Sequence, residues 1–496
     1  MTTKVIKGSM WTLGGSVIPL AVSFISTPFI IRFLGTESYG VLLLVGLIPT
    51  YFSFADFGMG VASTKFAAEA YGQGDEKKEV ELVWTATAIA AASALVVALP
   101  LFLFSFQIVR LLNVPEHLLA EANIALKIAS VSFFIGILSS VLNSPMLARL
   151  RMDLNTVTQA VPRILLAVVT PFVLYFGGGI IGAVGWSFLI TVGMLGAVTY
   201  FSGRLLPRLV RPTINRDFVR PLLKFGGAWF VAMVAAILLV NLEKLFLTKL
   251  VSVKALAYYS VAFTFANMAT MFSMAMTQSL VPAFSQLQMP EKKAEFDSLF
   301  SRSIRLNIIW LLPVLLLMFV VAKPFFTVWA GEDFGRESTF PFYLLLIGLF
   351  FNILAYVPHA SITAAGRTDI FAKLYWIELV VYVAVAFFMI GRFGIIGAAA
   401  AWSIRITLDA ILVILLSKKI TRTAFLPFAQ GSAPLAAAVA SLILPLLAAM
   451  AFNVNSTNLI LVACFSTTVY SFIVWNRLMQ SDERDWMRTR LSFLIK

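Results

Sequence analysis

Fourteen mostly apolar stretches constrain the fold of this 496-residue chain more than any other feature of its sequence. A helix that crosses the hydrocarbon core of a bilayer needs about 20 predominantly apolar residues. The composition agrees, because 60% of the residues are hydrophobic and only 12% are charged, against about 25% charged residues in soluble proteins. We therefore predict an all-α, polytopic membrane protein with about 14 transmembrane helices, over residues 9–31, 40–64, 82–104, 122–146, 157–176, 180–202, 222–248, 255–284, 306–322, 340–363, 371–391, 394–416, 433–452 and 457–475.

The residues that usually carry metal or covalent chemistry are scarce. The chain has one cysteine, Cys464, and two histidines, His117 and His359, which lie far apart. One cysteine cannot form an internal disulfide or a cysteine-based metal site. The sequence contains no GxxxxGK[ST] nucleotide-binding loop and no GxSxG or HExxH pattern, which are typical of ATPases, hydrolases and zinc proteases. It therefore predicts a protein that is not an enzyme and has no metal and no cofactor.

The basic residues are distributed unevenly between alternate loops. With the N-terminus in the cytoplasm, 28 of the 38 Lys and Arg residues fall on cytoplasmic segments. Because cytoplasmic loops of membrane proteins are enriched in these residues, we predict that both termini are cytoplasmic. The same distribution explains much of the net charge of +14 without a nucleic-acid partner. The uncharged run 8–31 is too long for the core of a cleaved signal peptide, so we expect a retained helix.

Short motifs recur along the chain at an offset of 215 to 217 residues. The matched pairs are 29–35 with 246–252, 151–154 with 367–370, and 179–183 with 394–398. Three matches in the same order indicate a duplicated unit of six helices, and an even number of helices gives both copies the same orientation. Some transporters consist of such parallel repeats, with the substrate site between the halves. We predict an N-lobe over 1–212, a C-lobe over 213–428, two further helices over 429–478 and a cytoplasmic tail over 479–496.

Several segments resemble those of a known family. Residues 33–40, FLGTESYG, resemble the LGxxxYG link between the first two helices of bacterial polysaccharide flippases, and residues 55–60, ADFGMG, resemble the DxGxG stretch of their second helix. Residues 241–260 resemble the family pattern xxDxxLIxxxxGxxxxGxYxxA, with Glu243-Lys244 in place of Asp-Arg and with Ser252 and Ala257 in place of two glycines. Over roughly 5–420 the chain is similar to the oligosaccharide and polysaccharide (O-antigen type) flippases of the multidrug/oligosaccharidyl-lipid/polysaccharide exporter superfamily.

The resemblance implies a V-shaped pair of six-helix lobes around a central cavity, in the cytoplasmic (inner) membrane. It implies that undecaprenyl-pyrophosphate-linked oligosaccharide is moved by alternating access from the inner to the outer leaflet, for O-antigen, capsule or exopolysaccharide synthesis. The implied partners are this anionic lipid-linked oligosaccharide, membrane lipids, and the polymerase and glycosyltransferases of the same pathway.

Two alternative functions stay open from the sequence. One is a cation-coupled multidrug exporter of the same superfamily, which needs an acidic cavity, whereas this chain has more deep bases than deep acids. The other is a membrane polysaccharide polymerase or glycosyltransferase, which would usually have a large external loop. The longest external loops expected here, near 105–121 and 323–339, are short. The balance of charges therefore favours an anionic substrate that is transported.

Ionisable residues deep within apolar stretches are the candidate functional residues, because each costs at least ~2.5–3.5 kcal/mol on insertion scales. Arg405 lies near the middle of its predicted helix, and Asp409 lies one turn further on the same face. One hypothesis is that Arg405 binds the pyrophosphate and Asp409 holds it in place. The alternative is a self-neutralising pair that joins this helix to a neighbour.

Arg163 and Glu378 occupy nearly equivalent places in the two repeats. They could meet across the cavity, or Arg163 could extend to the inner surface while Glu378 pairs locally. The other predicted substrate-binding cations are Lys244, Arg32, Lys249 and Lys127, and the other predicted charge partners are Asp56 and Glu243. The structural alternative for the cations near helix ends is that they anchor the helices at the membrane interface. For Asp56 it is a packing site in which a neighbouring donor forms a hydrogen bond with the buried acid.

Overall fold

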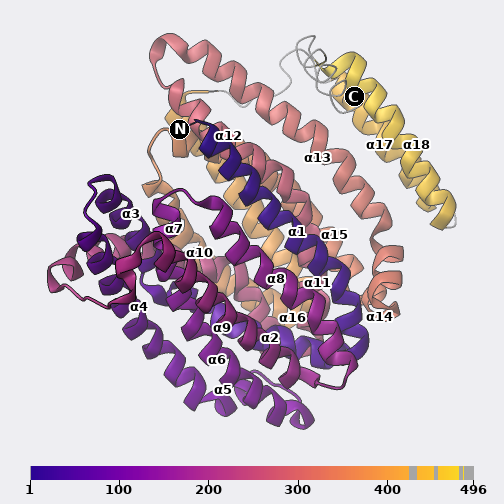
Figure 1. Ribbon diagram of the computed structural model, residues 1–496. Helices are drawn as coiled ribbons and strands as arrows, with labels where there is room; N and C mark the ends of the chain where they lie inside the picture. Colours follow the sequence, from indigo (N-terminus) through magenta and orange to yellow (C-terminus); the bar gives the residue numbers. More distant parts are fainter. Residues whose placement is uncertain (1, 424–432, 452–455, 480–483, 485–496) are drawn as a thin grey trace, which may run out of the picture. The chain divides into compact units, whose positions relative to one another are not determined.

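The computed structural model describes residues 2–423, 433–451, 456–479 and 484, and within these ranges every regular element is a helix (Figure 1). Nine segments of this described part are long and apolar enough to cross a membrane. The prediction of an all-α, multi-pass membrane protein is confirmed. The predicted boundary at 428–429 and most of the predicted tail over 479–496 lie outside the described residues.

All fourteen predicted stretches fall on helices in the described part of the chain, although some are interrupted and the number that spans the membrane remains a prediction. The first half contains α1 (Thr2–Leu34), α2 (Thr36–Tyr51), α3 (Met59–Gly72), α4 (Glu76–Leu103), α5 (Ser105–Leu111), α6 (Leu119–Leu142), α7 (Ser144–Ala148), α8 (Met152–Tyr175) and α9 (Gly179–Leu205). They are followed by α10 (Val219–Leu250), α11 (Val253–Asn267), α12 (Met271–Gln286), α13 (Lys293–Ala330), α14 (Glu332–Glu337), α15 (Thr339–Ala364), α16 (Asp369–Thr421), α17 (Ala433–Ala451) and α18 (Ser456–Ile473).

The helices group into two compact units. The first consists of Met1–Ala257 together with Tyr375–Val383, and the second of Tyr258–Leu374 with Ala384–Lys496. In the first unit, α4 buries a row of alanines at four-residue spacing, Ala86, Ala90, Ala94 and Ala98. Small side chains at this spacing let helix backbones approach closely, and α4 packs along α6 through them.

In the second unit, the core forms where α12, α13 and α15 meet. Phe284 and Phe300 are almost completely buried there, against Val357 and Ala360 of α15. The last two helices pack on α13, where the buried hydroxyl of Tyr470 donates a hydrogen bond of 3.0 Å to the carbonyl oxygen of Ile309. Burial of these aromatic rings and the hydrogen bond of the buried Tyr470 hydroxyl stabilise these contacts.

Three of the predicted helices are broken, which corrects the expectation of continuous spans over 40–64, 122–146 and 255–284. The second of these is interrupted at Asn143, between α6 and α7. Short 3₁₀ turns interrupt the other two, η1 (Ser53–Asp56) and η5 (Met268–Thr270), and these two breaks are separated by the offset of the sequence repeat. At the first break, Phe57 and Gly58 have positive φ angles of 55° and 71°. The Asp56 carboxylate accepts the backbone N–H groups of Gly58 and Gly60 at 2.9 and 3.2 Å, so it ends one helix and starts the next.

The repeat is visible in the backbone of both halves. Leu150 and Gly366 have φ angles of 55° and 73°, and each precedes an arginine that bonds the aspartate two residues on. The Nε to Oδ1 distances are 2.9 Å for Arg151–Asp153 and 3.2 Å for Arg367–Asp369. Gly179, the first residue of α9, and Gly394, within α16, also share a positive φ, 57° and 55°. Gly394 therefore divides α16 into two arms that correspond to α8 and α9, as the predicted helices 371–391 and 394–416 require.

Candidate functional site

A cavity of about 840 Å³ lies within the first unit, among α1, α2, η1, α6, α8 and α9. Its volume is in the range of about 300–1,000 Å³ that is typical of ligand sites. Two of its lining residues, Pro19 and Pro49, lie inside α1 and α2. Proline removes a backbone donor and bends a helix, so these two helices are not straight where they line the cavity.

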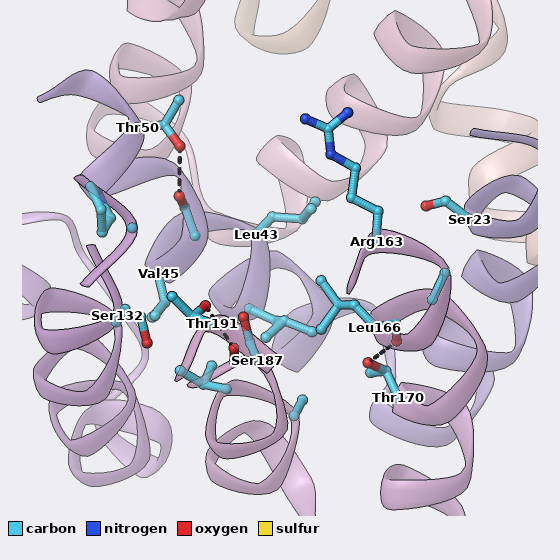
Figure 2. A pocket seen from close by; sticks show the side chains of 18 of the residues that line it. Ser23, Leu43, Val45, Thr50, Ser132, Arg163, Leu166, Thr170, Ser187 and Thr191 are labelled. Atoms are coloured by element: carbon cyan, nitrogen blue, oxygen red, sulfur yellow. Dashed lines mark hydrogen bonds between the residues drawn. The ribbon is translucent and has the colours of Figure 1, made fainter. Parts of the chain in front are cut away.

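Arg163 of α8 is the only charged residue among the described residues that line this cavity. Its side chain is exposed, and Figure 2 shows it extending from α8 in the vicinity of Ser23 and Leu43. An arginine in this position presents a planar set of N–H donors to whatever occupies the cavity. The structure thus places a predicted substrate-binding cation in a cavity, where its charge is accessible to a ligand.

Hydroxyl groups form the other polar part of the lining. Five of them donate to the carbonyl oxygen four residues earlier in their own helix, at 2.6 to 3.0 Å: Thr27, Thr50, Ser132, Thr170 and Thr191. Three of these bonds, those of Thr50, Thr170 and Thr191, are drawn in Figure 2. Because the hydroxyl hydrogen is used within the helix, each oxygen offers lone pairs to donors in the cavity.

Sequence reasoning did not identify these hydroxyl residues. A signal was available, because Ser23 and Thr27, and likewise Ser187 and Thr191, are four residues apart and so share one helix face. Serine and threonine are ordinary in membrane helices, however, and only the packing shows which of them line a cavity.

The polar residues near the middle of α10 make contacts within the first unit. Glu243 is completely buried, and its Oε2 atom accepts a hydrogen bond of 3.0 Å from the hydroxyl of Tyr382 of α16. Lys244 Nζ donates to Asn241 Oδ1 at 2.9 Å, and the hydroxyl of Tyr51 donates to the carbonyl oxygen of Asn241. These bonds join α2, α10 and one arm of α16, and the roles of Glu243 and Lys244 in transport stay predictions.

Three further predicted cations have other surroundings, and two of them, Arg32 and Lys249, lie in the last turns of their helices. Lys249 Nζ donates to the carbonyl oxygen of Leu111 at 2.7 Å, and Asn113 donates to the carbonyl oxygen of Lys249 at 2.7 Å. Lys127 lies 5.6 Å from the ring centroid of Phe102. Arg32 is exposed in the last turn of α1. None of the three is among the described residues that line the cavity.

The remaining predicted residues lie on α16 and at the first helix break. Arg405 and Asp409 are both partly buried in α16. Glu378 is 8% exposed on the other arm of α16. Asp56 has the backbone contacts of its packing alternative. The structure brings Arg163 alone of the predicted residues to the described lining of the cavity, and the functions of the others stay predictions.

Comparisons with known proteins agree with the resemblance seen in the sequence. The chain is 24% identical over 416 residues to a putative O-antigen transporter of Shigella flexneri, across 83% of this chain and 97% of that protein. Its structure matches the lipid II flippase MurJ, in an inward closed conformation, with a TM-score of 0.72 at 14% identity, over 96% of this chain and 100% of that chain. It matches an inward-facing MATE family multidrug transporter of the MOP superfamily with a TM-score of 0.69 at 13% identity, over 84% and 94%.

Identities this low in the solved structures show the fold alone, which is that of MOP-superfamily transporters. The family is shown by the sequence itself. A family model described as a polysaccharide biosynthesis protein matches residues 29–339, more than half of the chain. The chain therefore belongs to the polysaccharide biosynthesis protein family.

Proposed function

We propose that this chain moves a lipid-linked oligosaccharide with an anionic pyrophosphate from the inner to the outer leaflet of the cytoplasmic membrane, for polysaccharide biosynthesis. The observation that carries the proposal is the lining of the cavity, which combines one cation, Arg163, with many hydroxyl groups. Membership of the polysaccharide biosynthesis family supports the substrate class. The relative from Shigella flexneri, which is described as a putative O-antigen transporter, supports the proposal that this chain is a transporter.

The cation has a clear task in such a carrier. A pyrophosphate keeps its negative charges as it crosses the hydrocarbon layer, and an isolated ion costs on the order of tens of kcal/mol to desolvate by Born estimates. A carrier must replace the lost water with fixed positive charge. The guanidinium of Arg163 can hold two phosphate oxygens at once through parallel hydrogen bonds, which an ammonium group cannot do.

The hydroxyls suit the sugar part of the same substrate. Sugar hydroxyl groups are donors as well as acceptors, and the oxygens of Thr50, Thr170 and Thr191 have lone pairs available because their hydrogens are bonded to backbone carbonyls. Weak acceptors spread over several helices do not select one sugar sharply. They provide a polar surface on which different sugar units can replace their hydrogen bonds to water with hydrogen bonds to the protein.

The multidrug alternative fits this cavity less well. A cation-coupled exporter of cationic drugs needs a carboxylate in the cavity, and no Asp or Glu is among the described residues that line it.

We further propose that the chain is not an enzyme and that it works with the glycosyltransferases and polymerase of its pathway. We also propose that both termini are cytoplasmic. An external reporter enzyme fused at Ser338 should then be active and one fused at Gly203 inactive, and the reverse pattern would overturn the orientation.

The test of function replaces Arg163 in a strain that lacks its own flippase. We expect Arg163→Ala to abolish surface polysaccharide at normal protein levels, with lipid-linked oligosaccharide accumulating in the inner leaflet. Arg163→Lys should restore part of the activity, because it keeps the charge but loses the paired hydrogen bonds. The matched control is Arg204→Ala, since Arg204 is exposed on α9 and stacks on Tyr200 at 4.9 Å outside the cavity. Wild-type polysaccharide with Arg163→Ala would refute the assignment of this cavity.

A further inference from the structure

A second, smaller cavity lies in the second unit at the two ends of α16. It measures about 410 Å³ and is lined by Arg367, Ile370, Leu416, Lys419, Ile420 and Arg422. Because the bend at Gly394 divides α16 into two arms, the start and the end of this long helix meet around the cavity. Nothing in the proposed transport cycle requires a site at this place.

The lining has equal numbers of cations and aliphatic side chains. Arg367 shares its charge with Asp369 at 3.2 Å, and Asp369 is also 4.0 Å from Lys373. Lys419 and Arg422 are exposed, and within the described ranges neither forms an ion pair at 4.0 Å or less. The cavity therefore offers a net positive charge beside an apolar wall.

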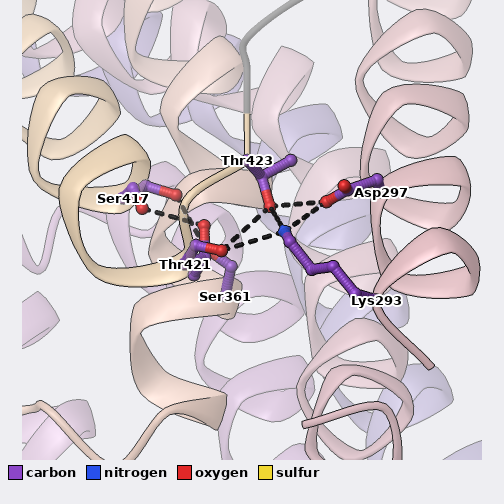
Figure 3. A network of polar contacts seen from close by, with 6 residues as sticks. All are labelled: Lys293, Asp297, Ser361, Ser417, Thr421 and Thr423. Atoms are coloured by element: carbon purple, nitrogen blue, oxygen red, sulfur yellow. Dashed lines mark hydrogen bonds and ion pairs between the residues drawn. The ribbon is translucent and has the colours of Figure 1, made fainter. Parts of the chain in front are cut away.

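The backbone holds Arg422 in an unusual conformation. Its φ angle is 54°, in the left-handed region that side-chain-bearing residues seldom adopt. Both neighbours are fixed by the start of α13 (Figure 3): Lys293 Nζ donates to the carbonyl oxygen of Thr421 at 2.9 Å and to Thr423 Oγ1 at 2.6 Å. Thr423 Oγ1 in turn lies 2.7 Å from Asp297 Oδ1 and donates to it.

A second contact fixes the last turns of α16. The hydroxyls of Ser417 and Ser361 are hydrogen-bonded at 2.8 Å in a buried position, which ties α16 to α15 (Figure 3). The backbone of the segment that carries Lys419 and Arg422 is thus held on both sides by buried or charged hydrogen bonds. A segment whose backbone is already fixed loses less freedom when an anion binds, which favours the binding.

We propose that this cavity binds the headgroup of an anionic phospholipid, with its cations on the phosphate and its aliphatic wall against the first part of an acyl chain. A free phosphate would use the cations but not the wall formed by Ile370, Leu416 and Ile420. Basic pockets between helices at the membrane surface are known to suit anionic lipid headgroups. The lipid site is separate from the cavity around Arg163, so the inference does not depend on the proposed function.

The test measures lipid binding to the purified full chain in neutral detergent by native mass spectrometry. Phosphatidylglycerol and phosphatidylcholine are compared, with inorganic phosphate, inorganic pyrophosphate and undecaprenyl pyrophosphate as competitors. The variant is Lys419→Gln with Arg422→Gly, because glycine removes the charge and accepts the left-handed backbone. The matched control is Lys418→Gln with Arg151→Gln, which removes an exposed neighbour of the cavity and the first-half counterpart of Arg367.

We expect wild-type protein to bind phosphatidylglycerol in preference to phosphatidylcholine. The cavity variant should bind phosphatidylglycerol about 30-fold more weakly, because each basic residue near an anionic lipid surface contributes roughly a factor of five, and the control should change less than twofold. Equal loss in variant and control, or no loss in either, would overturn the site. Displacement of the lipid by inorganic phosphate or pyrophosphate would overturn the choice of a lipid, and stronger binding of undecaprenyl pyrophosphate would assign the cavity to substrate instead. Lys419→Gln alone gives a surface variant that tests the same charge if the double variant is not monodisperse.

Discussion

The pair formed by Glu79 and Arg149 allows a quantitative test of how the first unit is held together. Glu79 of α4 is completely buried, and the Arg149 side chain, just after α7, is 9% exposed. The guanidinium donates to both carboxylate oxygens, Nη1 to Oε1 and Nη2 to Oε2, the latter at 3.0 Å. It also lies 4.4 Å from the ring centroid of Tyr71. The carboxylate therefore depends on one partner for its charge compensation within the described structure.

Removing Arg149 should lower the free energy of unfolding by far more than the intact ion pair contributes to it. Breaking a buried ion pair by deleting one partner typically costs about 3–5 kcal/mol, because the other charge stays buried without compensation. We expect Arg149→Met to lower the free energy of unfolding by about that amount. Replacing both partners, in Arg149→Met with Glu79→Leu, should recover most of the loss, since well-packed apolar side chains often substitute for a buried pair at little cost.

The control is a pair of the same chemistry two residues further along. Arg151 and Asp153 are 45% and 39% exposed and lie 2.8 Å apart, and exposed pairs contribute only about 0–1 kcal/mol. Arg151→Met should therefore leave stability nearly unchanged. The assay is thermal unfolding of the detergent-solubilised protein, followed by fluorescence-detected size exclusion. A double variant as unstable as Arg149→Met, or an equal effect of Arg151→Met, would refute the reasoning.

Two further predictions follow from other parts of the molecule. Arg405→Ala should abolish surface polysaccharide at normal protein levels, as scored by polysaccharide staining. If Arg405 binds the phosphate, the additional change Asp409→Ala should not restore the polysaccharide. Recovery in the double variant would show that Arg405 only neutralises Asp409. Gly58→Ala should destabilise the protein by more than the roughly 1–2 kcal/mol of a left-handed backbone, because its φ is 71° and a Cβ would lie 2.6 Å from the carbonyl oxygen of Gly226. Gly72→Ala, with nothing within 4 Å of the added carbon, is the control, and equal unfolding temperatures for the two variants would contradict this account.

The positions of the helices were predictable because hydrocarbon length alone demands long apolar stretches. The breaks in them were not, although their cause is local. Asp56 and Gly58 form a helix start within an apolar window, and the hydropathy of the window hides the turn. Phe57 has a positive φ although it is not a glycine. The residue type at that position therefore does not indicate a left-handed backbone.

The candidate site was predictable only in its charge. Arg163 stands out in an apolar stretch because an ionisable group there needs a reason. The hydroxyls of Thr50, Thr170 and Thr191 do not stand out, since bonding to their own helix makes them acceptable anywhere in a membrane. Which of them line a cavity is decided by helix packing, which depends on contacts between residues far apart in the sequence.

The two halves of the chain keep the same backbone turns but differ in charge. The positive φ angles of Leu150 and Gly366 recur at the repeat offset, because every copy of this fold must make the same turn between two helices. No such requirement places a charge within an apolar helix, where it has a cost. Arg163 in the first half nevertheless corresponds to Glu378 in the second, at an offset of 215 residues. Duplication explains the shared turns and leaves the opposite charges unexplained, so a difference in chemistry between the halves must account for them. An anionic substrate that is held by the first half would meet that condition, which agrees with the anion site proposed at Arg163 from the lining of the cavity.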